Sequence, residues 1–146
     1  MKKVLSILIM FIIVASYFNM SSFAYDTVID DEIIVMDINS AEKSSNLSID
    51  YNNKATCNSI FSDINSNIYK IKVVQTLEKH WAFGVFFAVN NASWERTFYT
   101  DSLSMTNYKY NLEGGTYRVK TTFIVTLYNG QTESIDVYSS EVVVYV

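Results

Sequence analysis

The sequence predicts an all-β protein whose strands pack as an antiparallel β-sandwich behind an N-terminal signal peptide. Apolar and polar residues alternate from Tyr117 to Tyr128, which is the period of a half-buried strand. Asn129-Gly130 follows at once, a residue pair typical of hairpin turns. The rest of the chain divides into short β-rich segments separated by Asn, Ser and Gly, without a convincing helical period.

Residues 1–24 have the pattern of a signal peptide, which we expect to be helical. Lys2 and Lys3 precede an apolar run over residues 4–15, and Ser22-Phe23-Ala24 supplies the small residues of a cleavage site. The run is shorter than the ~20 residues that span a bilayer, which favours a cleaved signal peptide. The alternative interpretation is an uncleaved membrane anchor. We therefore expect a secreted chain that has no membrane segment after cleavage.

Residues 25–44 are expected to be an acidic N-terminal arm or, through Ile33–Ile38, an edge strand. The arm carries Asp26, Asp30, Asp31, Glu32, Asp37 and Glu42 and has no Lys or Arg before Lys43. These acids lack the glycine and the spacing of a calcium loop, so we interpret them as solvated charges. Without Lys2 and Lys3 the chain has nine basic residues against 15 acidic ones, a balance that disfavours nucleic-acid binding.

Residues 45–146 are expected to form the β-sandwich domain, because their length suits one core. The strands expected before Tyr117 are Leu47–Tyr51, Ala55–Ser62, Tyr69–Lys79, Val85–Val89, Trp94–Thr100 and Tyr108–Leu112. Ser44-Ser45-Asn46 and Asn90-Asn91 are among the turns expected between them.

The segment from Tyr117 onward predicts a C-terminal hairpin. The face expected to be buried carries Tyr117, Val119, Thr121, Phe123, Val125 and Leu127. Arg118 and Lys120 alternate with them and are expected in solvent. Asn129-Gly130 predicts a type I′ turn, in which both residues have positive φ. Gln131–Tyr138 then returns antiparallel, and Glu141–Val146 is the last expected strand.

The residues that could carry catalysis are few. Cys57 is the only cysteine and His80 the only histidine, which excludes an internal disulfide, paired-cysteine zinc motifs and histidine clusters. A Cys57–His80 nucleophile is conceivable, but Cys57 alternates with Ala55 and Ser59 on a face expected to be buried. We therefore expect no enzyme, no catalytic or metal-binding residues and no cofactor.

Aromatic residues crowd the middle of the chain. Because a sandwich without a disulfide must fill its core from these rings, the core is the default position expected for them. Phe86 and Phe87 are adjacent, so they point to opposite faces of a strand and one can be exposed. The candidate binding surface consists of Trp81, Phe83, Phe86, Phe87, Trp94 and Tyr99.

The stretch Gly114–Lys120, "GGTYRVK", resembles the start of strand F in immunoglobulin-like β-sandwiches. In that fold a tyrosine at the position of Tyr117 bonds back to the backbone, an arrangement called the tyrosine corner. The resemblance implies an immunoglobulin-like sandwich, although Val119 stands where the family's disulfide cysteine would be. Cys57, on an earlier strand, therefore has no partner.

A second resemblance covers about the last two thirds of the chain. Its motifs are Leu77-Glu78-Lys79, Gly84-x-Phe86, Val89, Ser93-Trp94, Gly115–Lys120, Thr132-Glu133-Ser134 and Tyr138-Ser139. They are similar to those of small exported β-sandwich proteins of low-GC Gram-positive bacteria, a family of uncharacterised function. This chain departs from the family pattern with Glu78 for Gln, Phe86 for Trp and a longer loop after Gly84. The resemblance implies export and a sandwich, without a site.

Together these observations favour a secreted, non-catalytic binding or adhesion module, acting at the cell surface or in the medium. Its partner would be a carbohydrate or a surface protein, with a carbohydrate-binding module as one alternative. A bacteriocin-like secreted effector is the other alternative, because it too needs only a signal peptide and a compact β-domain.

Overall fold

A computed structural model describes residues 41–63 and 67–145 of the chain, and every regular element in these ranges is a β-strand. The strands are β1 (Glu42–Ile49), β2 (Ala55–Ser62), β3 (Ile68–His80), β4 (Phe86–Phe98), β5 (Ser102–Lys109), β6 (Gly115–Leu127), β7 (Thr132–Tyr138) and β8 (Val142–Val144). The expected signal peptide and the Ile33–Ile38 strand lie outside the described residues.

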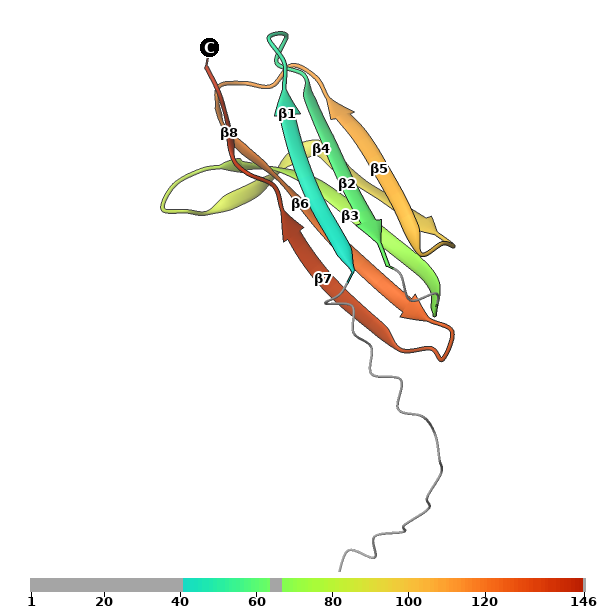
Figure 1. Cartoon of the computed structure of the whole chain (residues 1–146). Coiled ribbons are helices and arrows are strands. Elements are labelled where there is room, and N and C mark those ends of the chain that lie inside the picture. Colours follow the sequence, from blue (N-terminus) through green and yellow to red (C-terminus); the bar gives the residue numbers. More distant parts are fainter. Residues whose placement is uncertain (1–40, 64–66, 146) are drawn as a thin grey trace, which may run out of the picture. The chain divides into compact units, whose positions relative to one another are not determined.

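The strands form two antiparallel sheets that pack face to face (Figure 1). One sheet has the order β1-β2-β5, and the other has the order β4-β3-β6-β7, with β8 also paired to β6. All strand pairs within both sheets are antiparallel. The prediction of an all-β antiparallel sandwich is confirmed.

The strands with the clearest alternation lie where the sequence places them. β2 occupies Ala55–Ser62 as predicted and buries every second residue, Cys57 among them. β6 buries the predicted face from Tyr117 to Leu127. These two strands face each other across the core, so their apolar faces determine how the sheets meet.

Three strand predictions are wrong. β1 begins at Glu42 and includes Ser44-Ser45-Asn46, which we expected to be a turn, because Ser45 faces inward and finds a hydroxyl partner there. Asn90-Asn91 does not separate two strands but lies within the single strand β4. β5 spans Ser102–Lys109 instead of Tyr108–Leu112, since Leu103 and Met105 supply its buried face.

The predicted type I′ turn is also wrong. Gly130 has a positive φ of 86°, whereas Asn129 is absent from the positive-φ residues of the described chain. The Gly130 N–H donates to Leu127 O, and the Leu127 N–H donates to Gln131 O. This pattern fits a three-residue loop that ends in a left-handed glycine. The Asn129 side chain accepts the Gln131 N–H and closes the loop.

The core consists of two apolar clusters separated by a polar layer. Phe61, Val73 and Phe123 belong to one cluster, and Cys57, Leu77 and Val119 belong to the other. Between them, fully or almost fully buried polar side chains link the two sheets: Ser45, Ser59, Gln75 and Thr121. No buried side-chain polar atom in the described ranges lacks a hydrogen-bond partner.

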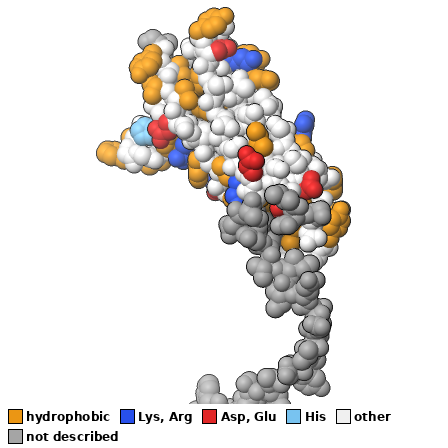
Figure 2. All heavy atoms as spheres, in the orientation of Figure 1, with side chains coloured by type: hydrophobic (Ala, Val, Ile, Leu, Met, Phe, Trp, Pro, Cys, Tyr) orange, Lys and Arg blue, Asp and Glu red, His pale blue; other side chains and the backbone are white. Residues whose placement is uncertain are grey.

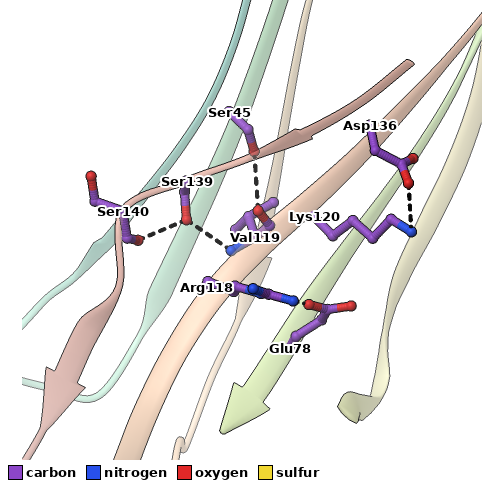
Figure 3. Close-up of polar contacts among 8 residues, drawn as sticks. All are labelled: Ser45, Glu78, Arg118, Val119, Lys120, Asp136, Ser139 and Ser140. Atoms are coloured by element: carbon purple, nitrogen blue, oxygen red, sulfur yellow. Dashed lines mark hydrogen bonds and ion pairs between the residues drawn. The ribbon is translucent and has the colours of Figure 1, made fainter. Parts of the chain in front are cut away.

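The outer face of the larger sheet carries the charges expected on β6 (Figure 3). Arg118 Nε lies 2.8 Å from Glu78 Oε2, and Lys120 Nζ lies 2.9 Å from Asp136 Oδ2. Ser139 Oγ accepts the Val119 N–H and donates to Ser140 O. Arg118 and Lys120 therefore pair with carboxylates of the neighbouring strands β3 and β7.

Tyr117 makes the hydrogen bond expected of a tyrosine corner. Its hydroxyl donates to Glu113 O at 2.8 Å, and the residue is only 2% exposed. Replacing Tyr117 with Phe is expected to lower the free energy of unfolding by about 0.5–1.5 kcal/mol, because one partly buried hydrogen bond is lost. Urea denaturation measures this change, with Tyr145→Phe as the control at an 86% exposed position. Equal midpoints for the Tyr117→Phe variant and the parent would contradict the assignment.

Candidate functional site

The hairpin between β3 and β4 brings together three of the six predicted surface aromatics, Trp81, Phe83 and Phe87. Their exposed fractions are 72%, 104% and 55%. The Trp81 and Phe87 ring centroids lie 5.7 Å apart. The hairpin projects away from the sheets (Figure 1), and Figure 2 shows hydrophobic side chains at its end. The default expectation of a core position is wrong for these three residues.

The other three predicted aromatics do not belong to this exposed group. Phe86 is half-buried on the opposite face of β4 from Phe87, as adjacent residues on a strand require, with the Arg118 guanidinium 3.8 Å from its ring centroid. Trp94 is half-buried and packs against both core clusters. Tyr99 is 71% exposed, but it follows the far end of β4, where its ring contacts Tyr69. The predicted set is therefore not one surface.

A bulge in β4 separates the hairpin from the body of the sheet. Thr76 pairs with Ser93, but Glu78 pairs with Ala88, so residues 89–92 lie opposite Leu77 alone. Asn91, within this bulge, has a φ of 55°. Bulges bend a strand and re-aim its side chains. The Asn90-Asn91 pair thus marks a bend in one strand, where the sequence suggested a gap between two.

The hairpin tip has a defined turn. The Trp81 N–H donates to Val85 O at 2.9 Å, and the Val85 N–H donates to Ala82 O at 3.0 Å. The Gly84 N–H donates to His80 Nε2 at 3.3 Å. Three backbone donors of the tip therefore find acceptors within the hairpin, which helps it to hold its shape while it projects from the sandwich.

Phe83 has an unfavourable environment on two counts. Its φ is 53°, a left-handed conformation that is rare for a bulky side chain. Its side chain is fully exposed, so no burial offsets this strain. Glycine or asparagine would suit the backbone better. Strained residues of this kind are concentrated at functional sites.

A pocket of about 630 Å³ opens beside the hairpin, within the usual size range of ligand sites. Trp81, Phe87, Val89 and Leu112 form its apolar lining. The polar lining comes from three segments of the chain: Lys79, His80, Asn90, Lys109, Asn111 and Glu113. A ligand in the pocket would meet aromatic rings and hydrogen-bonding groups together.

The GGTYRVK stretch supports one wall of this pocket. Lys79 Nζ lies 3.3 Å from Glu113 Oε2 and 5.6 Å from the Tyr117 ring centroid. A β-carbon on Gly115, whose φ is 151°, would come within 2.6 Å of Lys79 Cε. A side chain at position 115 would therefore displace the end of Lys79 from its present position, and the Tyr117 hydroxyl holds the carbonyl of Glu113.

Contacts with neighbouring groups raise the pKa of the Lys79 ammonium. Burial lowers its pKa, but the hydrogen bond and the charge of Glu113, together with Tyr117, outweigh burial, so that the net pKa is raised. Lys109 Nζ donates to Asn90 O at 2.9 Å and ties the end of β5 to the bulge of β4. Both lysines thus line the pocket and are held by contacts within the protein. Each ammonium has three N–H donors, so it can also donate to a ligand.

The residues considered for catalysis do not form a reactive pair. Cys57 is fully buried, and burial raises the pKa of its thiol to about 12, so the thiolate is scarce at neutral pH. His80 contributes its Nε2 lone pair to the hairpin turn. Within residues 41–63 and 67–145, no group of three His, Cys, Asp or Glu side chains could hold a metal ion. The acids at positions 30, 31, 32 and 37 lie outside these ranges.

The polar lining of the pocket was missed by sequence reasoning. Lys79 looked like an ordinary strand end, Asn90 like a turn residue and Asn111 like part of a strand. These residues meet only because the bulge, β5 and the loop before β6 converge. The one usable signal was the Asn-Asn pair within a β-rich stretch, since asparagine tolerates the left-handed backbone of a bulge.

Comparisons of the chain with protein-family models, with curated proteins and with solved structures give no match. In the described part of the chain, no helix has the length and apolar character needed to span a membrane.

Proposed function

We propose that this chain is a secreted, non-catalytic binding module that adheres to a cell surface through the β3–β4 hairpin. Exposed aromatic residues are enriched where proteins meet their partners, and here three of them share one projecting hairpin. A tip that is ordered by its own hydrogen bonds binds at a lower entropic cost than a flexible loop.

The exposure and the strained backbone of Phe83 are the observation that carries this proposal. The residue is exposed and conformationally strained, so it contributes nothing to the stability of the fold that a glycine would not. A contact with a partner explains both features, because binding would bury the ring that folding leaves in solvent. Trp81 and Phe87, on the same hairpin, contact each other and line the pocket.

We also assign the sandwich to the immunoglobulin-like class. The division of strands between a β1-β2-β5 sheet and a sheet containing β3, β6 and β7 supports this assignment, because immunoglobulin-like domains divide their strands in the same way. The Tyr117 hydrogen bond supports it further. Cys57 and Val119 lie in one buried cluster, at the strand positions that the family's disulfide would join. In such folds, loops at the ends of the sheets commonly carry binding sites.

Flow cytometry with intact bacterial cells tests the adhesion proposal. The full chain is expressed in a secreting host, and the released protein is labelled and compared with Trp81→Ala, Phe83→Gly and Phe87→Ala. Each change is expected to weaken cell binding at least tenfold, because each removes an aromatic contact. Phe83→Gly is also expected to raise the free energy of unfolding by up to about 1 kcal/mol, since left-handed strain is relieved.

Tyr99→Ala is the matched control, because Tyr99 is as exposed as Trp81 but lies at the far end of the sheet. It should leave cell binding unchanged. Equal binding by the parent and all three hairpin variants would refute the proposal. Weakened binding in Tyr99→Ala as well as in the hairpin variants would refute the assignment to the hairpin.

A further inference from the structure

The lining of the pocket beside the hairpin combines two chemically distinct kinds of side chain. Trp81, 72% exposed, and Phe87, 55% exposed, contribute aromatic rings to it. Asn90 and Asn111 are exposed as well and belong to the same lining. A purely apolar ligand would leave those amides without partners on binding, at a cost for every polar group that it buried.

The two asparagine side chains are available to a ligand. Among the hydrogen bonds of the described chain, none involves the side-chain amide of Asn90 or Asn111, whereas the Asn90 carbonyl already accepts from Lys109. Each amide offers two donors and one acceptor oxygen. Lys79 and Lys109 add further donors, and Glu113 adds acceptors. The combination suits a ligand that carries several hydroxyl groups.

We propose that this pocket binds a pyranose ring of an oligosaccharide, stacked on Trp81 and hydrogen-bonded to Asn90 and Asn111. This inference rests on the proposed adhesive function and names its ligand class. A pyranose has an apolar C–H face and a rim of hydroxyl groups, so it matches both the aromatic and the polar side chains of the lining. Trp81 suits the first contact because an exposed indole combines a large apolar face with a polar edge.

A lipid surface fits the same observations less well. An inserted tip would draw the adjoining amides and lysines towards a region where polar groups are costly. The acidic balance of the chain, 15 acidic against 11 basic residues, also disfavours anionic membranes. Vesicle binding is therefore an alternative outcome of the test below.

Tryptophan fluorescence provides a direct test, because the chain has only two tryptophans and Trp94→Phe leaves Trp81 as the sole reporter. The secreted protein in this background is titrated with cellotriose, chitotriose and trigalacturonate, and separately with phosphatidylcholine vesicles. At least one sugar is expected to give a saturable change with a Kd of about 1 mM or tighter. The panel distinguishes plain, acetamido and carboxylated sugars as sources of the shared pyranose chemistry.

The variants locate the site. Asn90→Ala combined with Asn111→Gly is expected to weaken sugar binding at least tenfold, because two hydrogen-bonding amides are lost. Glycine is chosen at position 111 because Asn111 has a φ of 57° and alanine would add strain. Tyr99→Ala should bind the sugar as the Trp94→Phe parent does. Circular dichroism shows whether each variant is folded.

The outcomes separate the two proposals. Cell binding that depends on the hairpin, without a response to any sugar, would overturn the sugar assignment and leave adhesion standing. If the protein shows neither hairpin-dependent cell binding nor a response to any sugar, both the adhesion proposal and the sugar site are overturned. A sugar response that survives the double asparagine change, or a Trp81 response to vesicles alone, would also overturn the sugar site.

Discussion

Replacing Gln75 with alanine is expected to lower the free energy of unfolding by about 3–5 kcal/mol. Gln75 is fully buried in β3, and its amide links both sheets. Its Nε2 donates to Ser59 Oγ at 2.6 Å, and its Oε1 accepts from Asn107 Nδ2 at 2.9 Å. Truncation leaves a cavity between the two apolar clusters and removes partners from both neighbours.

The size of the effect follows from the position of Gln75 in the polar layer. Ser59 and Ser45 both contact Thr121 Oγ1, at 2.7 and 2.9 Å, so the layer crosses from one sheet to the other. A buried network of this kind is stable only when each member is satisfied. In Gln75→Ala, Ser59 would keep Thr121 as a partner. The Asn107 amide would lose its acceptor, and no other group of the protein would fill the space left by Gln75.

Urea denaturation of the parent, Gln75→Ala and Gln75→Leu separates the two contributions. Leucine fills the cavity but restores no hydrogen bond, so we expect it to recover part of the loss and to remain about 1–3 kcal/mol below the parent. A Gln75→Ala loss below about 1 kcal/mol would mean that water replaces the side chain. A free energy of unfolding of Gln75→Leu equal to that of the parent would mean that the hydrogen bonds of Gln75 make no net contribution to stability.

The same polar layer explains where sequence reasoning failed. Alternation identified β2 and β6 because their inward residues are mostly apolar or β-branched. It failed for β1, whose inward Ser45 follows Ser44 and precedes Asn46, a composition typical of turns. Ser45 is stabilised as an inward strand residue by the hydrogen bond between its hydroxyl and that of Thr121, 76 positions away. A local pattern carries no information about so distant a partner.

The candidate site was only partly predictable, because it too depends on contacts between residues far apart in the sequence. Adjacent Phe86 and Phe87 predicted that one ring is exposed, because strand neighbours point to opposite faces. Which ring is exposed depends on Arg118, which covers Phe86 from β6. Trp81 and Trp94 look alike in sequence, but one lies beyond the bulge and the other packs on the core. The bulge itself is a register change between two strands, which requires both strands to be known.

Cys57 should make the protein less stable above pH 9. Its folded pKa is raised from 9.0 to about 12 by burial. Because the neutral thiol is favoured in the fold, its contribution is complete below pH 9 and is lost progressively as the pH rises towards 12. In that window the unfolded chain releases a proton that the folded chain retains. Each pH unit between these values lowers the free energy of unfolding by about 1.4 kcal/mol.

Lysine and tyrosine side chains also titrate in this range, so the test compares the parent with Cys57→Ala under reducing conditions. Alanine creates a cavity in the cluster that contains Leu77 and Val119, a cost that does not depend on pH. The stability advantage of the parent over Cys57→Ala should therefore shrink by about 2 kcal/mol between pH 8 and 10.5. Parallel pH profiles for the two proteins would contradict a buried thiol. Rapid alkylation of the folded parent at neutral pH would contradict it as well, because a reagent can reach Cys57 only if the two sheets open.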